Sequence, residues 1–116
     1  MRKILCLTIM LMFLATFAFA DRNTSTITAY KDSNNLVKLG NWKVYRVTLV
    51  CLIAGGSFAI FDATSYPADP LASVKAEGQE ATQYNSTVYD FTNKPLEGNT
   101  GLYLNVNKAN IIMEYE

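Results

Sequence analysis

Histidine is absent from this sequence of 116 residues. It is the side chain most often used as a general base and as a metal ligand, so its absence removes the commonest routes to catalysis and metal binding. The six glycines form no phosphate-binding pattern, and the acidic residues do not gather into the carboxylate pair of a glycoside hydrolase. We therefore expect a protein that is not an enzyme and that uses no cofactor and no metal.

Cysteine and net charge are also scarce. Cys6 belongs to the apolar N-terminal segment, and Cys51 stands alone in the most apolar stretch of the remaining chain, which predicts a buried thiol. The ten basic and ten acidic residues balance. Without Arg2 and Lys3, eight basic residues face ten acidic ones, a net charge of −2. This charge favours neither nucleic acid nor an anionic membrane surface as a partner.

The first twenty residues, MRKILCLTIMLMFLATFAFA, have the pattern of a secretory signal peptide. A basic start is followed by an apolar run over residues 4–17 and by the small-x-small pattern AFA at residues 18–20. The apolar run is short for a membrane span, which needs about 20 residues. We expect residues 1–20 to be removed before Asp21. The product is then secreted to the extracellular space, the cell surface or the periplasm, and has no membrane span.

The stretch VTLVCLIAGGSFAIF, residues 47–61, is also too short to span a bilayer, and Gly55 and Gly56 interrupt it. It is rich in β-branched and aromatic residues, which favour strands, and two glycines favour the tight turn of a β-hairpin. In that hairpin Ile53 would face Phe58, and Cys51 would face Ile60. The alternation predicts one core face, made by Val47, Leu49, Cys51, Ile53, Phe58 and Ile60.

A second hairpin is predicted over residues 101–116, with its turn near Asn107 and Lys108. A two-residue loop there would pair Leu104 with Ile111 and Leu102 with Met113, and these four residues are expected in the core. Shorter strands are predicted over residues 25–30, 71–76 and 87–91, and turn-forming segments separate them.

About seven short strands without a helical period predict an all-β fold, a small antiparallel β-sandwich of jelly-roll type. We place this domain at residues 36–116. A polar arm precedes it at residues 21–35, with an edge strand of its own.

Aromatic side chains are the best candidates for surface contacts. Tyr66, Trp42, Tyr84 and Tyr103 fall in predicted loops, at strand starts or on outward faces, where they could stack on sugar rings or anchor an interface. Alternatively, Trp42 and Tyr89 close the ends of the core. Asp62 and Asp69 flank a turn whose spacing matches no defined calcium loop, so a structural turn is expected there. Asn23 and Asn85 begin N-glycosylation patterns.

Three short patterns between residues 44 and 116 carry a resemblance to a known group of proteins. Ile60-Phe61-Asp62 ends a strand, LASV at residues 71–74 begins another, and Gly101-Leu102-Tyr103 opens the last predicted hairpin. In this order of features the chain resembles the small jelly-roll-like β-sandwich proteins of tailed phages, of the minor virion or decoration type. The resemblance implies a β-sandwich fold and a structural role in a virion.

Three functions follow as hypotheses. The first is an exported, non-enzymatic structural, assembly or surface-interaction module, whose partner is a second copy or another surface protein. In that case the arm at residues 21–35 could add a strand to a neighbour's sheet. The second is a virion decoration protein of phage type. The third is a carbohydrate-binding or adhesion module with a glycan as its partner.

Export with cleavage is directly testable. When the full chain is produced in a host with a general secretory pathway, we expect the exported protein to begin at Asp21, because residues 18–20 fit the cleavage site. Intact-mass spectrometry of the exported fraction measures this. A product that retains residues 1–20 would contradict the assignment.

Overall fold

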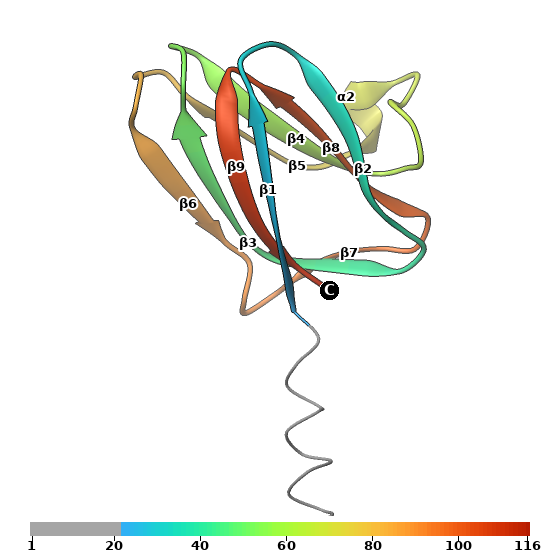
Figure 1. The fold of residues 1–116 in the computed structure, drawn as a ribbon. Helices are drawn as coiled ribbons and strands as arrows, with labels where there is room; N and C mark the ends of the chain where they lie inside the picture. Colours follow the sequence, from blue (N-terminus) through green and yellow to red (C-terminus); the bar gives the residue numbers. More distant parts are fainter. Residues whose placement is uncertain (1–21) are drawn as a thin grey trace, which may run out of the picture.

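The computed structural model describes residues 22–116, so the predicted signal peptide at residues 1–20 lies outside the described part of the chain. The described part is an all-β sandwich of two antiparallel sheets that face each other, with one short helix, α2 (Pro70–Ser73), beside them (Figure 1). No helix in residues 22–116 is long and apolar enough to cross a membrane.

The first sheet, sheet A, has the strand order β1-β9-β3-β6, and the short β7 pairs with β3 beyond the end of β6. The second, sheet B, has the order β2-β8-β4-β5. Two opposed sheets with these strand orders form a jelly roll, to which β7 adds a fifth strand in sheet A. The strands of sheet A are β1 (Asn23–Ala29), β9 (Ala109–Tyr115), β3 (Trp42–Cys51), β6 (Ser86–Asp90) and β7 (Leu96–Gly98). Those of sheet B are β2 (Ser33–Leu39), β8 (Gly101–Asn107), β4 (Gly56–Asp62) and β5 (Val74–Glu80).

The chain crosses between the sheets at most of its turns. Among the described strands, only β4 and β5 are neighbours both in sequence and in a sheet. Both predicted hairpins are therefore wrong: β3 and β9 lie in sheet A, whereas β4 and β8 lie in sheet B. Cys51 pairs with Ala109 instead of Ile60, and Leu104 pairs with Ile60 instead of Ile111. The alternation of the sequence fits either arrangement, because the same residues face inward in a hairpin and in a crossing between two sheets.

The core lies between the sheets and is built from the inward residues of both. The described chain has no buried polar or charged side chain. Ile53, predicted in the core, is 40% exposed, because β3 ends at Cys51 and Ile53 lies in the turn that follows. The other predicted core residues are all buried: Val47, Leu49, Cys51, Phe58, Ile60, Leu102, Leu104, Ile111 and Met113.

Two turns that connect the sheets, β3–β4 and β8–β9, contact each other at the end of the sandwich where Cys51 lies. The Lys108 carbonyl, in the β8–β9 turn, accepts hydrogen bonds from the backbone N–H groups of Leu52 (2.9 Å) and Ile53 (3.2 Å) in the β3–β4 turn. Gly55 has a φ of +86°, but Gly56 is already the first residue of β4, so the turn is not the predicted Gly-Gly loop. A Cβ atom on Gly56 would lie 2.7 Å from the Lys108 oxygen, which explains why glycine stands there.

Several boundaries differ from the prediction. The predicted strand at residues 71–76 is divided between α2 and β5, and the segment AEGQE, expected to be a turn, lies inside β5. Residues 22–116 contain nine strands rather than about seven, because β2 and β7 form within segments that resemble turns. The predicted arm at residues 21–35 contains β1, which pairs with β9 of its own sandwich, and the start of β2.

The close approach at Gly56 leads to a stability prediction. Gly56→Ala should lower the free energy of unfolding by about 1–3 kcal/mol, because the added methyl group must displace the backbone of the Lys108 turn. Urea unfolding measures this. The neighbouring substitution Ser57→Ala, on the outer face of β4, is the control and should change stability by less than about 0.5 kcal/mol. An unchanged stability of Gly56→Ala would contradict the interlocked turns.

Candidate functional site

The most highly connected polar group of the described chain is the carboxylate of Asp62, at the end of β4. Its Oδ1 accepts hydrogen bonds from the indole N–H of Trp42 (3.0 Å) and from the backbone N–H groups of Thr100 (2.9 Å) and Gly101 (3.2 Å). Its Oδ2 accepts one from the backbone of Asn99 (3.2 Å). Asp62 belongs to sheet B and Trp42 to sheet A, so one carboxylate joins the two sheets and the β7–β8 loop.

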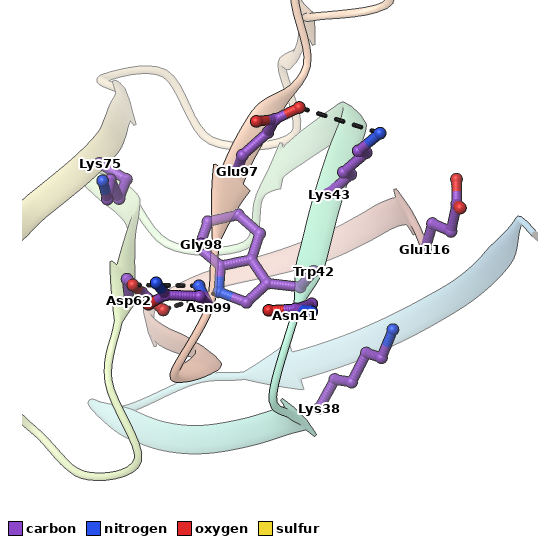
Figure 2. A pocket seen from close by; sticks show the side chains of 10 residues that line it. All are labelled: Lys38, Asn41, Trp42, Lys43, Asp62, Lys75, Glu97, Gly98, Asn99 and Glu116. Carbon is purple, nitrogen blue, oxygen red and sulfur yellow. Dashed lines mark hydrogen bonds and ion pairs between the residues drawn. The ribbon is translucent and has the colours of Figure 1, made fainter.

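Trp42 is held by shape as well as by its hydrogen bond. It is the first residue of β3 and pairs with Gly98 of β7. A Cβ atom on Gly98 would lie 2.3 Å from the indole ring, so only glycine leaves room for this side chain. Figure 2 shows the indole lying against Gly98 with its nitrogen toward Asp62. Trp42 is 2% exposed and closes this end of the core.

The hydrogen bonds set the charge state of Asp62. Burial by itself raises the pKa of a carboxyl group, because it disfavours the charged form. The bonds from Thr100, Gly101, Trp42 and Asn99 favour the carboxylate and together outweigh burial, so the pKa of Asp62 lies below its usual value of 3.8. At neutral pH this group is an anion whose acceptor positions face structural donors.

A polar cavity of about 600 Å³ opens beside this cluster. Its charged lining is balanced, with three lysines and three carboxylates. Lys43 and Glu97 approach to 3.9 Å (Figure 2). The hydroxyl group of Tyr45 donates a hydrogen bond to Glu116. The charged residues around the cavity are Lys38, Lys43, Lys75, Asp62, Glu97 and Glu116. Such a lining does not select a ligand of one charge.

Glu116 also fixes Tyr45. The hydrogen bond to Glu116 raises the pKa of the Tyr45 hydroxyl, with burial and the Glu116 charge adding to the rise, so the hydroxyl remains a donor at neutral pH. The guanidinium group of Arg22 lies 3.9 Å from the centre of the Tyr45 ring, a cation–π contact. The carboxylate of Glu116 is therefore also held by a structural donor.

The chemical capacity of this end of the sandwich is limited. No group of three or more potential metal ligands occurs within residues 22–116. Asp69, considered together with Asp62 from the sequence, accepts a hydrogen bond from the Ala72 backbone at 3.3 Å and caps α2. Cys51 lies at the opposite end, fully buried, with its sulfur 2.9 Å from the Ile53 carbonyl. The cluster around Asp62 can position backbone and exclude water, and it offers no nucleophile beside a base.

The four predicted contact aromatics are divided by the fold. Two of them are not surface contacts: Trp42 is buried against Gly98, and Tyr103 is 8% exposed between its strand partners Leu36 and Phe61. Tyr66 and Tyr84 are exposed. Tyr66 packs edge-on against Phe61, near Asp62, whereas the backbone of Tyr84 bonds to the Cys51 carbonyl at the other end. The two exposed rings therefore cannot act as one stacking platform.

An apolar surface strip follows the outer face of sheet B near Asp62. Leu36 of β2 pairs with Tyr103 of β8, which pairs with Phe61 of β4, and the Tyr66 ring lies over Phe61 with 5.7 Å between ring centres. Leu39 continues the strip along β2. The exposed members, Leu36, Leu39 and Tyr66, are 43%, 67% and 48% exposed. We call these three residues the outer apolar strip.

Sequence reasoning did not anticipate this cluster or this strip. Asp62 and its backbone donors are separated by 37 to 39 residues, and Leu36 lies in β2 whereas Tyr66 lies in the loop after β4. Gly98 is a local sign that another group approaches the backbone closely. Only the pairing of β3 with β7 shows that this group is Trp42.

No protein-family model and no curated protein sequence matches this chain. Similar solved structures include the major capsid protein P2 of bacteriophage PM2, which is 16% identical with a TM-score of 0.43 over 81% of this chain and 42% of that one. Two structures of the tobacco streak virus coat protein are 12% and 11% identical, with TM-scores of 0.35 and 0.34. Each covers 84% of this chain, and the chain spans 88% and 86% of them.

These neighbours are viral capsid and coat proteins, and the likeness is one of fold. The chain spans less than half the length of the PM2 protein. The strand order of the chain itself identifies its fold as a jelly roll, the fold class that the sequence predicted.

The Asp62 cluster leads to a prediction about pH. Since the pKa of Asp62 is lower in the folded than in the unfolded chain, its charge stabilises the fold above about pH 4, and this stabilisation is lost as the pH falls through the folded pKa. Asp62→Asn should therefore lower the free energy of unfolding at pH 7 by about 2–3 kcal/mol. The difference from the wild type should shrink toward pH 3.

Urea unfolding at several pH values tests this. Asp69→Asn is the matched control, because asparagine caps helices about as well as aspartate, and it should leave stability nearly unchanged. A loss of stability in Asp62→Asn that is the same at pH 7 and pH 3 would show that the charge is not what joins the sheets.

Proposed function

We propose that this protein is an exported, non-enzymatic jelly-roll module that works by surface contact, as a structural or assembly component. The observation that carries the proposal is the outer apolar strip. Monomeric soluble proteins rarely leave large contiguous apolar patches exposed, and such patches commonly mark contact sites. Here Leu36 and Tyr66 remain exposed although the residues beside them, Tyr103 and Phe61, are covered.

The site at Asp62 supports the non-enzymatic part of this proposal. Its strongest acceptor faces four structural donors, and the hydroxyl of Tyr45 is engaged by Glu116. Catalytic carboxylates, by contrast, are held with an acceptor or a proton directed toward substrate. The polar groups at this end act on the protein itself, by fixing one sheet to the other.

Two more specific functions, a virion role and a glycan-binding role, differ in how well the described residues support them. A role as a decoration or minor structural protein of a virion is compatible with a jelly roll that contacts neighbours through one face, although a fold alone does not imply a function. A glycan-binding role has less support, because Trp42 is buried and the exposed Tyr66 and Tyr84 lie at opposite ends of the sandwich.

The test is whether the outer apolar strip places the protein in a larger assembly. In native extracts of cells that make it, the protein should elute well above its monomer mass on a sizing column. Leu39→Lys should move it to lower mass, because a charge cannot be buried in an apolar contact. The control Val88→Lys introduces the same charge at an exposed apolar residue of sheet A and should leave the elution unchanged. Wild-type elution as free protein would contradict the proposal.

A further inference from the structure

The two sheets end in four edge strands, which differ in how well they are protected. The edges are β1 and β6 in sheet A, and β2 and β5 in sheet B. An edge strand presents unpaired backbone N–H and C=O groups, to which another strand can add. Natural sheets block such addition with charged side chains, with irregular register or with very short strands.

Three of the four edges carry these features. The register of β2 shifts between Leu36 and Lys38, and Lys38 adds a charge. The pairing of β5 with β4 is also irregular, and β5 contains Lys75, Glu77 and Glu80. The strand β6 has only five residues and ends at Asp90, whose carboxylate lies 3.7 Å from Arg46.

The remaining edge, β1, has none of them. Its seven residues, NTSTITA, include no charged side chain and no proline, and its register with β9 is unbroken from Asn23 to Ala29. The nearest preceding charge, Arg22, lies over the Tyr45 ring of β3, toward the interior of the sheet. Thr24, Thr26 and Thr28 alternate along its exposed face, and threonine favours extended backbone.

We propose that β1 pairs antiparallel with β1 of a second copy, about a two-fold axis through Thr26, so that the two A sheets form one continuous sheet. The proposal rests on the proposed function and names its partner. In this register Thr26 faces the partner's Thr26, and Thr24 faces the partner's Thr28. Paired threonines across strands are favourable, and no like charges meet.

A second copy fits this edge better than an unrelated strand for two reasons. The pairing about Thr26 is self-complementary, which is the requirement of a two-fold contact, the commonest form of oligomer. In addition, Tyr30 directly follows β1 and is 63% exposed, so apolar surface continues beside the edge. The two A sheets together would have the order β6-β3-β9-β1-β1-β9-β3-β6, with the β7 of each copy beside β3, which makes ten strands and stays within the usual size of a twisted sheet.

Two double substitutions test both the contact and its register. Thr24→Lys with Thr28→Lys places like charges opposite each other twice, whereas Thr24→Lys with Thr28→Glu places opposite charges there twice. Within one copy, position 24 faces Glu114 and position 28 faces Asn110, so the Lys substitution at 24 meets the same neighbour in both variants. Each variant is purified as the exported chain, and circular dichroism checks that it is folded.

Light scattering behind a sizing column gives the mass over a range of concentrations. We expect a dimer for the wild type and for the Lys/Glu variant, and a dissociation constant at least about tenfold higher for the Lys/Lys variant. A monomeric wild type would overturn the proposal. Dimers of equal affinity in both variants would place the contact elsewhere, and loss of dimers in both would overturn the pairing about Thr26.

A failure of β1 pairing and a failure of the proposed surface-contact function give different experimental results. If the purified wild type is monomeric but native extracts still contain it in a large assembly that Leu39→Lys disrupts, the surface-contact function stands and β1 pairing fails. If the purified protein is dimeric and extracts contain nothing larger, β1 pairing stands and the outer apolar strip lacks its assembly role.

Discussion

The hydrogen bonds to the carboxylate of Asp62 are the interaction on which one end of this sandwich depends. A jelly roll sends successive strands to opposite sheets, so its sheets must be joined by contacts between residues distant in sequence. Here one carboxylate accepts hydrogen bonds from the indole of Trp42 in sheet A, from the backbone of Asn99 and Thr100 in the β7–β8 loop, and from the backbone of Gly101 at the start of β8. Charge-assisted bonds of this kind are stronger than neutral ones, and they also fix the direction in which the loop leaves the sheet.

The opposite end is joined by backbone contacts between turns and by the carboxylate of Glu80 in β5, which accepts a hydrogen bond from the Thr87 hydroxyl of β6 (2.9 Å). The carbonyl of Lys108 accepts from Leu52 and Ile53, and Gly56 leaves the space that this approach needs. Between the two ends lies a core with no buried polar side chain, so specificity of packing comes from shape and from these terminal contacts. Because the core holds no polar side chain, the polar groups around Asp62 are used for structural hydrogen bonds at the end of the sandwich.

The sequence predicted the faces of the strands better than their partners. Alternation identified the inward residues Leu49, Leu104 and Ile111, because a side-chain period of two requires only that one face is apolar. It could not show that Ile60 pairs with Leu104 rather than with Cys51, since a hairpin and a crossing between sheets bury the same residues. The strand order and the Asp62 cluster both depend on contacts across tens of residues, which no local pattern encodes.

Which residues are exposed at the surface also depends on contacts between residues that are far apart in the sequence. The burial of Trp42 and Tyr103 follows from their strand neighbours, Gly98 for the first and Leu36 and Phe61 for the second. From the sequence, Trp42 was open to two interpretations, a surface contact or a cap on the core, and Tyr103 was expected on an outward face. The segment of β1, in contrast, was predicted as part of a polar arm with an edge strand, and the fold places β1 at an edge of sheet A. The outer apolar strip and the β1 edge lie on different sheets, so a contact through one leaves the other open. A module with two such independent surfaces can join neighbours in an extended structure, which a single contact surface about a two-fold axis cannot do, because it closes on itself as a dimer.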